Sequence, residues 1–359
     1  MEIIFFLIPI IVALWLLLVK TKNVVWWEYF LLIGGSVLIT LAIRGIIIGI
    51  KTEDTEYLGG YVTETTYYEP WNELVTVTHT TTDSEGNTHT YTTTEVNSHG
   101  PSYNYKTSFG DTRGCSKKEH EKIKNKFKVK PIFRDLHRNY YTKDGDAYSY
   151  SWSGKDATMI TLTRTNKYRN PIKGSKSIFK LKRDGDSLLF DYPKIENKDQ
   201  RVILGRDNLD DRDLRILNSR LGKKYQVRAY LLIFPDTCGP EIAEKQKEYW
   251  EGGNKNELII CLGVKGDSVV WCNPFSWCDS PEVEVRLRDW YIENPKLNIK
   301  ELCRFLKPCI IKYWSRKNFK DFSYIKTELN IIDNIIILII TLIYTIGVGI
   351  YVVKNEYEN

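Results

Sequence analysis

Four aspartates that lie close together in the sequence are the residues best suited to bind a metal ion. Ca²⁺ and Mg²⁺ prefer carboxylate oxygens, so one of these ions is the cofactor that such a cluster would hold. The spacing is not that of an EF-hand loop, and acidic side chains at a helix start also interact favourably with the helix dipole. The sequence therefore favours a helix-start role without a cofactor, and a divalent cation site is the alternative. The four residues are Asp207, Asp210, Asp211 and Asp213.

Two pairs of cysteines resemble a zinc knuckle without matching its spacing. Five residues separate the members of each pair, and Pro274 or Pro308 lies inside it, whereas structural zinc sites usually use a tighter pair. Disulfides or small buried side chains are therefore favoured over zinc. The chain has seven cysteines, an odd number that permits three disulfides with one thiol, or seven thiols. The two pairs are Cys272 with Cys278 and Cys303 with Cys309.

Three histidines recur at intervals of ten residues, at His79, His89 and His99. In a hairpin that turns near residues 85–86, His79 and His89 would point to opposite faces, which argues against a shared metal ion. The sequence also lacks a serine nucleophile elbow, a phosphate loop and a zinc-hydrolase helix. These observations favour a protein that is not an enzyme.

A basic stretch, KKEHEKIKNKFKVK at residues 117–130, is the main concentration of positive charge. It is either a solvated helix face or a surface that contacts anionic lipid or an acidic partner, and the first is favoured. The formal net charge of the whole chain is only +6, so the composition gives no reason to expect nucleic acid as a partner.

Three apolar segments are long enough to cross a bilayer, and they predict the lipid membrane as the first partner of this chain. The first has neither a basic region before it nor a small-residue cleavage site after it, so we expect it to be retained. The protein is thus expected to be integral to the inner or plasma membrane. The segments are Ile3–Val19, Val24–Ile50 and Ile335–Val353.

The second segment contains a GxxxG spacing at Gly45 and Gly49, with Ala42 on the same helical face. Small residues let a second helix approach closely. We expect this face to pack against the third segment of the same chain, and a homo-oligomer is the alternative.

The charges near these segments disagree about the side of the membrane that carries the large polar insert. Lys20 and Lys22 between the first two segments favour a cytoplasmic loop and an exported insert. Basic residues just before the third segment favour a cytoplasmic insert. The Thr- and Tyr-rich stretch 61–94 is more typical of exported protein, so the extracytoplasmic side is favoured.

The chain divides into five predicted regions. They are a transmembrane hairpin at 1–51, a β-hairpin region at 52–115, a helix with a second hairpin at 116–199, an α/β domain at 200–326 and a third transmembrane helix at 327–359.

Within the insert, residues 71–97 predict a β-hairpin, and Ser116 with Glu119 predicts a capped helix start. Farther along, the sequence predicts alternating helices and strands. These are a helix at 208–221 stopped by Gly222, a strand at 225–234, a helix from Pro240 to Gly252, a hairpin of two strands at 258–264 and 269–272, a strand at 282–288, and a helix from Asn298 to Trp314.

This order of elements resembles the TPM domain, a small α/β module often tethered to membranes in bacteria and plastids. The matching stretches are Leu209–Leu214, the strand at 227–234 and YWEGGNKNELIICLGV at 249–264. The resemblance covers residues 200–315 and implies an α-β-α-β-β core. The whole chain is also similar to uncharacterised membrane proteins of bacteria and their phages, on the stretches DTEYLGGYVTE and HRNYYTKDGDAY.

The resemblance implies three functions. TPM proteins have been linked to assembly of membrane complexes, to phosphatase activity and to calcium binding. We therefore expect a non-enzymatic interaction or assembly factor that binds another membrane or envelope protein. The alternatives are a metal-dependent phosphoester hydrolase using Asp207–Asp213, and a phage- or plasmid-encoded envelope protein that acts on the host membrane.

Overall fold

The computed structural model describes residues 7, 10–15, 18, 25–136, 145–175, 188–193 and 200–358. The chain forms two compact units. The first unit contains residues 1–56, 167–184 and 317–359, and the second contains residues 57–166 and 185–316. The fold is a mixture of helices and sheets, as predicted. The five-region division stays a prediction.

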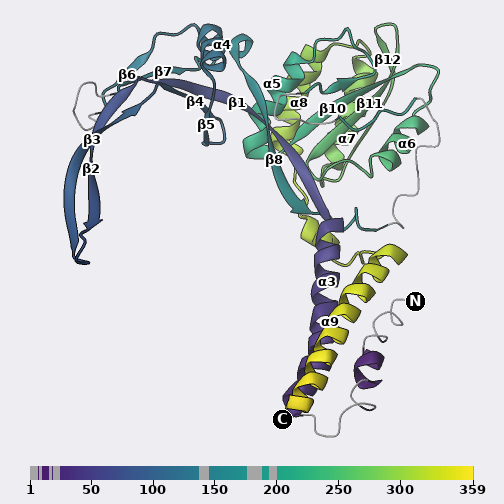
Figure 1. The fold of residues 1–359 in the computed structure, drawn as a ribbon. Helices are drawn as coiled ribbons and strands as arrows, with labels where there is room; N and C mark the ends of the chain where they lie inside the picture. The colour runs from purple at the N-terminus through teal and green to yellow at the C-terminus, as the bar shows by residue number, and fades with distance from the viewer. Residues whose placement is uncertain are drawn as a thin grey trace. The chain divides into compact units, whose positions relative to one another are not determined.

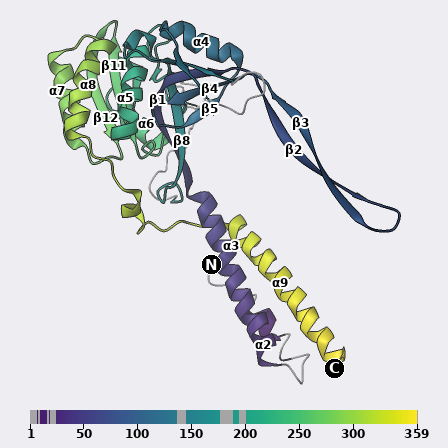
Figure 2. The same ribbon diagram turned by 90° about the vertical axis from the view of Figure 1, so that its left-hand side faces the viewer.

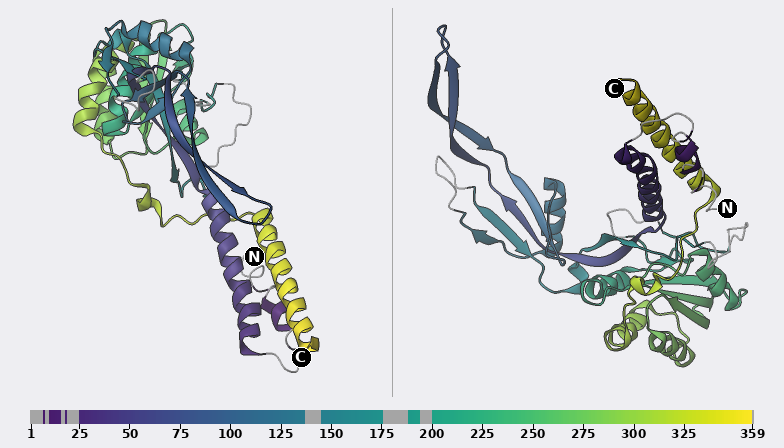
Figure 3. Two further views of the ribbon diagram at one scale, coloured as in Figure 1. Left: turned by 60° about the vertical axis from the view of Figure 1, so that its left-hand side comes forward. Right: turned by 90° about the horizontal axis from the view of Figure 1, so that it is seen from below.

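The first unit is built around two long apolar helices that lie side by side (Figures 1 and 3). One is a continuous run of α2 (Trp26–Tyr29), the π-helical turn η1 (Phe30–Gly34) and α3 (Gly35–Lys51). The other is α9 (Ile331–Glu358). Hydroxyl groups join them, with Ser36 Oγ 2.9 Å from Thr345 Oγ1 and Thr40 Oγ1 3.1 Å from Thr341 Oγ1. These contacts fix which faces of the two helices meet.

Both helices are long and apolar enough to cross a membrane, over Trp26–Lys51 and Ile331–Val352. Only 17% and 28% of their most apolar windows are buried within the protein. The structure thus has two such helices in its described part, where the sequence predicted three. The remaining segment, Ile3–Val19, falls largely outside the described residues.

The predicted contact between the GxxxG face and the third segment is wrong. A Cβ atom added at Gly45 would have no described atom within 4 Å, and one at Gly49 would meet only Arg169 Nη2, at 3.9 Å. Ala42 and Gly45 are exposed. The helix α9 packs instead along the Ser36 and Thr40 face, because hydroxyls there find partners across the interface. A homo-oligomer through the GxxxG face stays a prediction.

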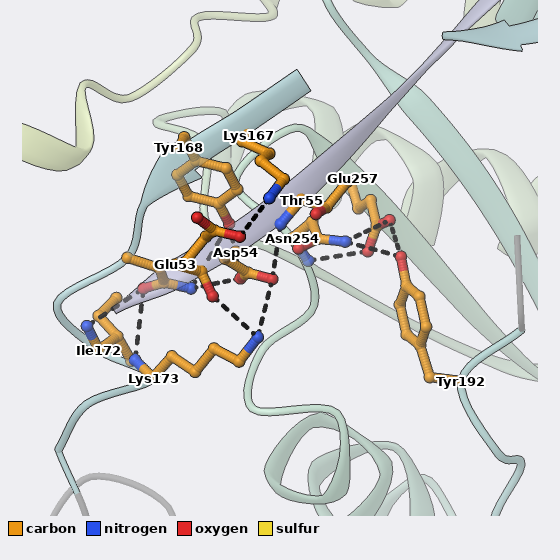
Figure 4. A network of polar contacts seen from close by, with 11 residues as sticks. Glu53, Asp54, Thr55, Lys167, Tyr168, Ile172, Lys173, Tyr192, Asn254 and Glu257 are labelled. Carbon is orange, nitrogen blue, oxygen red and sulfur yellow. Dashed lines mark hydrogen bonds and ion pairs between the residues drawn. The ribbon is translucent and has the colours of Figure 1, made fainter. Parts of the chain in front are cut away.

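A polar cluster lies where α3 ends and strand β1 (Glu53–Tyr68) begins without a linker. The Asp54 carboxylate accepts hydrogen bonds from Tyr168 OH at 3.0 Å, Asn170 Nδ2 at 2.8 Å and Lys173 Nζ at 3.3 Å (Figure 4). Within the same unit, Lys51 at the end of α3 forms an ion pair with Asp333 near the start of α9. The exit of the apolar helix into the strand is therefore fixed by partly buried hydrogen bonds and by an exposed one from Lys173. A short 3₁₀ helix, η3 (Phe319–Phe322), completes this unit.

The second unit contains the larger part of a six-stranded sheet. Its order is β5-β4-β1-β7-β6, and β8 pairs with β1 off this path. Helix α4 (Lys117–Phe127) begins at Ser116, whose hydroxyl accepts the Glu119 backbone N–H as predicted. The further elements are β4 (Ser102–Thr107), β5 (Thr112–Gly114), β6 (Ile132–Arg134), β7 (Ala147–Ser151), the 3₁₀ turn η2 (Asp156–Thr158) and β8 (Thr161–Arg169).

The predicted hairpin is confirmed as β2 (Trp71–Thr82) and β3 (Thr88–His99), which form a two-stranded sheet (Figure 2). Its predicted register is wrong by one residue. Thr81 pairs with His89 and His79 pairs with Tyr91, because the turn is centred on Glu85. His79, His89 and His99 therefore share one face, where they pair with Glu95, Asp83 and Glu73.

From α5 to β12, the α/β part of the second unit follows the predicted order of helix, strand, helix and two strands. A four-stranded sheet runs β12-β11-β10-β9, parallel except for β12 (Figure 1). Gly252 and Gly253, at φ +80° and +77°, end helix α6 and lead into β11, as the sequence predicted. The elements are β9 (Ile203–Leu204), α5 (Arg212–Tyr225), β10 (Arg228–Pro235), α6 (Glu241–Tyr249), β11 (Glu257–Lys265), β12 (Ser268–Ser276), α7 (Pro281–Glu293) and α8 (Ile299–Tyr313).

Strands β10 and β11 are buried on both faces. Leu231 and Leu258 pack with residues of α5, α7 and α8, whereas Leu232 and Ile259 pack with Ile242 of α6. Two apolar cores thus enclose the sheet, which explains why these strands read as continuous apolar runs.

The predicted strand at 282–288 is wrong, because these residues belong to helix α7. Pro281 occupies its first turn, and Val283, Leu287 and Tyr291 are buried at a spacing of four residues. Gly222 was also predicted incorrectly as a helix stop. Helix α5 continues through it to Tyr225 and ends at Gln226, which has φ +50°.

Gly222 is required for close packing, which predicts the effect of adding one methyl group. A Cβ at this position would overlap the backbone carbonyl oxygen of Gly59 in β1. We expect Gly222→Ala to lower the free energy of unfolding by about 1–3 kcal/mol, although alanine normally favours a helix over glycine. Thermal unfolding of the full chain in detergent measures this. Gly100→Ala, where a Cβ has open space, is the matched control. Equal midpoints for the two variants would contradict the packing argument.

Candidate functional site

A groove of about 530 Å³ lies in the second unit between α4, β1, β8 and the start of α5. This volume is in the range of pockets that hold small organic ligands. The capped start of α4 contributes Ser116 and Glu119 to one end of the groove. Four elements that are far apart in the sequence therefore build one concave surface.

The floor of the groove is apolar. Val62 of β1, Ile123 of α4 and Leu162 of β8 are 3%, 4% and 8% exposed, and they belong to one hydrophobic cluster. Tyr105 and Ile160 pack against the same cluster and also line the groove. An apolar floor favours ligands that carry hydrocarbon, because its burial removes both surfaces from water.

The wall of the groove is cationic. Lys118, Lys122 and Lys126 follow one side of α4 at intervals of four residues, and Arg215 of α5 adds a fourth cation. Glu119 is the single acidic residue in the lining. In the part of the chain that the structure describes, no carboxylate forms an ion pair with Lys118, Lys122 or Lys126.

These cations affect one another. Burial lowers the pKa of Lys126, and the positive charges of Lys122, Arg215 and Arg212 lower it further. An anion bound among them would favour the charged form of the amine, so the groove is electrostatically suited to a negatively charged group.

Asp211 holds the fourth cation in place. One of its carboxylate oxygens accepts a hydrogen bond from Arg215 Nε at 2.9 Å, and the other accepts the Val202 backbone N–H at 3.1 Å. Both oxygens of this predicted metal ligand are therefore engaged by the protein itself. Asp211 acts as a positioning residue for the groove.

The structure does not bring the four predicted aspartates together around one point. Asp207 is fully exposed and lies 3.7 Å from Arg201, and Asp210 is 3.8 Å from Arg212. Asp213 lies in the first turn of α5. Among the described residues, no group of three or more His, Cys, Asp or Glu side chains is arranged to hold a metal ion. A calcium or magnesium site here stays a prediction.

All seven cysteines are free thiols in the structure. Of the four singled out from the sequence, Cys278 and Cys309 are buried, whereas Cys272 and Cys303 are partly buried. Burial raises the pKa of Cys272 and of Cys303 to about 12 in each case. Thiolate is the reactive form, so burial lowers the reactivity of these two thiols.

A second polar group, around Glu257, lies inside the α/β core. Its carboxylate accepts hydrogen bonds from the Tyr192 hydroxyl and from the Asn254 backbone N–H, the latter at 2.8 Å (Figure 4). Nearby in the same core, the fully buried Arg228 donates to Tyr230 OH at 2.8 Å. Glu257 and Arg228 begin β11 and β10, and ligand sites in parallel sheets lie at the opposite ends of the strands. The group is therefore structural.

In comparisons with protein-family models, curated proteins and solved structures, none matched this chain. The resemblance to the TPM domain therefore stays a prediction.

The cationic side of the groove could be predicted in part from the sequence. Lysines at 118, 122 and 126 recur at helical spacing, which places them on one face of a capped helix. The contributions of Val62, Leu162 and Arg215 depend on long-range strand pairing and on helix packing, which no local pattern reveals.

The buried carboxylate of Glu257 predicts a specific pH dependence of stability. Burial raises its pKa above the ordinary value of 4.5, against the smaller effect of hydrogen bonds from Tyr192 and Asn254. Between 4.5 and the raised value the folded protein holds a proton that the unfolded chain has lost. This contribution to stability is therefore lost as pH rises through that window.

We expect wild type to lose stability relative to Glu257→Gln over this window, by at most about 1.4 kcal/mol per pH unit. Denaturant unfolding at a series of pH values measures the difference. Glu293→Gln, at an exposed glutamate of α7, is the matched control and should run parallel to wild type. A constant difference between wild type and Glu257→Gln would contradict the assignment.

Proposed function

We propose that this protein is a membrane-anchored, non-enzymatic interaction protein whose second unit binds an anionic partner through the groove beside α4. One observation carries the anchoring part of this proposal. The helices α3 and α9 expose large apolar side chains along their length even after packing on each other, among them Leu38 at 61%, Ile46 at 62% and Ile343 at 66%. Lipid is the environment in which such surfaces are stable.

The contacts between α3 and α9 also support a bilayer. Lipid supplies no hydrophobic force that drives helices together, so small and hydroxyl-bearing residues join them. The Ser36–Thr345 and Thr40–Thr341 pairs are of this kind. Most of the large apolar residues lie on the outer surface of the helix pair, although Leu32, Ile337 and Val352 are buried.

The chemistry of the second unit supports binding rather than catalysis. Burial raises the pKa of Cys272 and Cys303, and both oxygens of Asp211 are used within the protein. The groove offers lysines, an arginine and apolar side chains, which recognise a ligand without an obvious nucleophile or acid–base pair. An interaction or assembly role at the inner or plasma membrane follows from this combination.

Substitution of a lipid-facing residue tests the anchor. Aspartate at the centre of a transmembrane helix costs about 2.5–3.5 kcal/mol on insertion scales. We expect Ile343→Asp to reduce the fraction of the full chain that stays in the membrane pellet after alkaline carbonate extraction. Val270→Asp, at a β12 position that is 51% exposed, is the matched control and should remain in the pellet. Release of the wild-type protein by carbonate would refute the anchor.

We also propose that the second unit lies on the extracytoplasmic side, since Lys20 and Lys22 favour a cytoplasmic loop between the first two apolar segments. Ser84 lies in the exposed turn of the β2–β3 hairpin, where a thiol would be accessible. We expect Ser84→Cys to react with a membrane-impermeant maleimide in intact cells. Wild type gives the background from native thiols, several of which are buried. Labelling that appears only after permeabilisation would place this unit in the cytoplasm.

A further inference from the structure

The groove beside α4 combines two properties that together specify a class of ligand. Its floor of Val62, Ile123 and Leu162 is hydrocarbon, and its wall carries Lys118, Lys122 and Lys126. A purely ionic ligand would leave Tyr105 and Ile160, the half-buried apolar residues of the lining, uncovered. A purely apolar ligand would leave the lysines without an anion.

The lysines occupy one side of α4 over eight residues, a length of about 12 Å at the rise of an α-helix. Like charges four residues apart on a helix destabilise it by a few tenths of a kcal/mol per pair. Lys118, Lys122 and Lys126 have this spacing, and Arg215 faces the same groove from α5. Arg215 is already paired with Asp211, so a bound anion would mainly relieve the repulsion among the three lysines.

The dimensions and composition of the groove favour a small molecule over a macromolecule. Its volume of about 530 Å³ suits one ligand of small organic size. Tyr105 is the single aromatic residue in its lining, whereas binding of single-stranded nucleic acid uses several aromatic side chains as stacking platforms. An acidic protein segment would meet the lysines but would place polar backbone against the apolar floor.

We propose that the groove binds an anionic amphiphile, a molecule in which one hydrocarbon chain ends in a phosphate or carboxylate group. The chain lies on Val62, Ile123 and Leu162, and the anionic group lies among Lys122, Lys126 and Arg215. Asp211 keeps Arg215 turned toward this position through its 2.9 Å hydrogen bond. The inference deepens the proposed function, because it names the anionic partner of the same groove, and a membrane would supply such molecules.

The test uses the full chain in nanodiscs of zwitterionic phosphatidylcholine, titrated by calorimetry with empty nanodiscs as the reference. Detergent is avoided because its own alkyl chains would compete for the groove. The probes are octyl phosphate, octanoate, inorganic phosphate and octanol. They separate a charged chain from a free anion and from an uncharged chain.

We expect octyl phosphate to bind, and inorganic phosphate and octanol each to bind at least about tenfold more weakly, a difference of about 1.4 kcal/mol. The variant Lys122→Gln/Lys126→Gln should weaken octyl phosphate binding by at least about tenfold. Lys117→Gln/Lys130→Gln removes the same charge from exposed positions outside the lining and should bind like wild type. Octanoate should also bind, and its binding should depend on the same lysines, because the proposed ligand class includes carboxylates.

Other outcomes would overturn the proposal. Inorganic phosphate that binds as tightly as octyl phosphate would show that the apolar floor contributes nothing. Octanol that binds equally well in wild type and in Lys122→Gln/Lys126→Gln would show that the cations contribute nothing. Binding of a glutamate-rich peptide without binding of octyl phosphate would assign the groove to an acidic protein. Each result leaves the membrane anchor intact, since carbonate extraction of Ile343→Asp tests that separately.

Discussion

The structure depends on apolar surface that the protein itself does not cover. Leu38, Leu41 and Ile46 on α3, with Ile343 and Ile350 on α9, remain more than half exposed after the two helices pack together. Burial of one such side chain is worth about 1.5–3 kcal/mol, so leaving many of them in water would outweigh the stability of an ordinary domain. Hydrocarbon around this helix pair, as proposed above, would remove that cost. Two hydroxyl pairs join the helices, and Leu32 of η1 with Val348 of α9 adds an apolar contact.

The core of the second unit, in contrast, contains ionisable side chains. Glu257 and Arg228 are almost completely excluded from water, and their burial is costly unless hydrogen bonds satisfy them. The Tyr192 hydroxyl and the Asn254 backbone N–H donate hydrogen bonds to the Glu257 carboxylate. The Arg228 guanidinium donates one to the Tyr230 hydroxyl. These partners come from β10, from the turn before β11 and from residues 188–193. The network thus holds the first residues of β10 and β11 in place. It does not include the residues that line the groove beside α4.

Much of the fold could be predicted because burial on both faces gives β10 and β11 continuous apolar sequences, and Gly252 with Gly253 ends the helix between them. The errors arose where two patterns coincide. Residues 282–288 alternate like a strand, yet Val283 and Leu287 are four apart, and Pro281 starts a helix. The hairpin register differed from the predicted one because the turn centres on Glu85. A shift of one residue moves every side chain of one strand to the opposite face of the hairpin.

For the groove, only the feature that depends on local sequence could be predicted, namely the spacing of its lysines. Helical spacing predicts that Lys118, Lys122 and Lys126 share a face, but it cannot distinguish a solvated face from the wall of a groove. The packing of α4 over β1 and β8 decides this, because it places Val62 and Leu162 beneath the lysines. The aspartates illustrate the reverse case. Their clustering suggested a metal site, yet Asp211 uses both oxygens to join α5 to the strand before it and to orient Arg215. A carboxylate that resembles a metal ligand in the sequence thus holds a cation in position, and in the proposed function that cation would contact the anion.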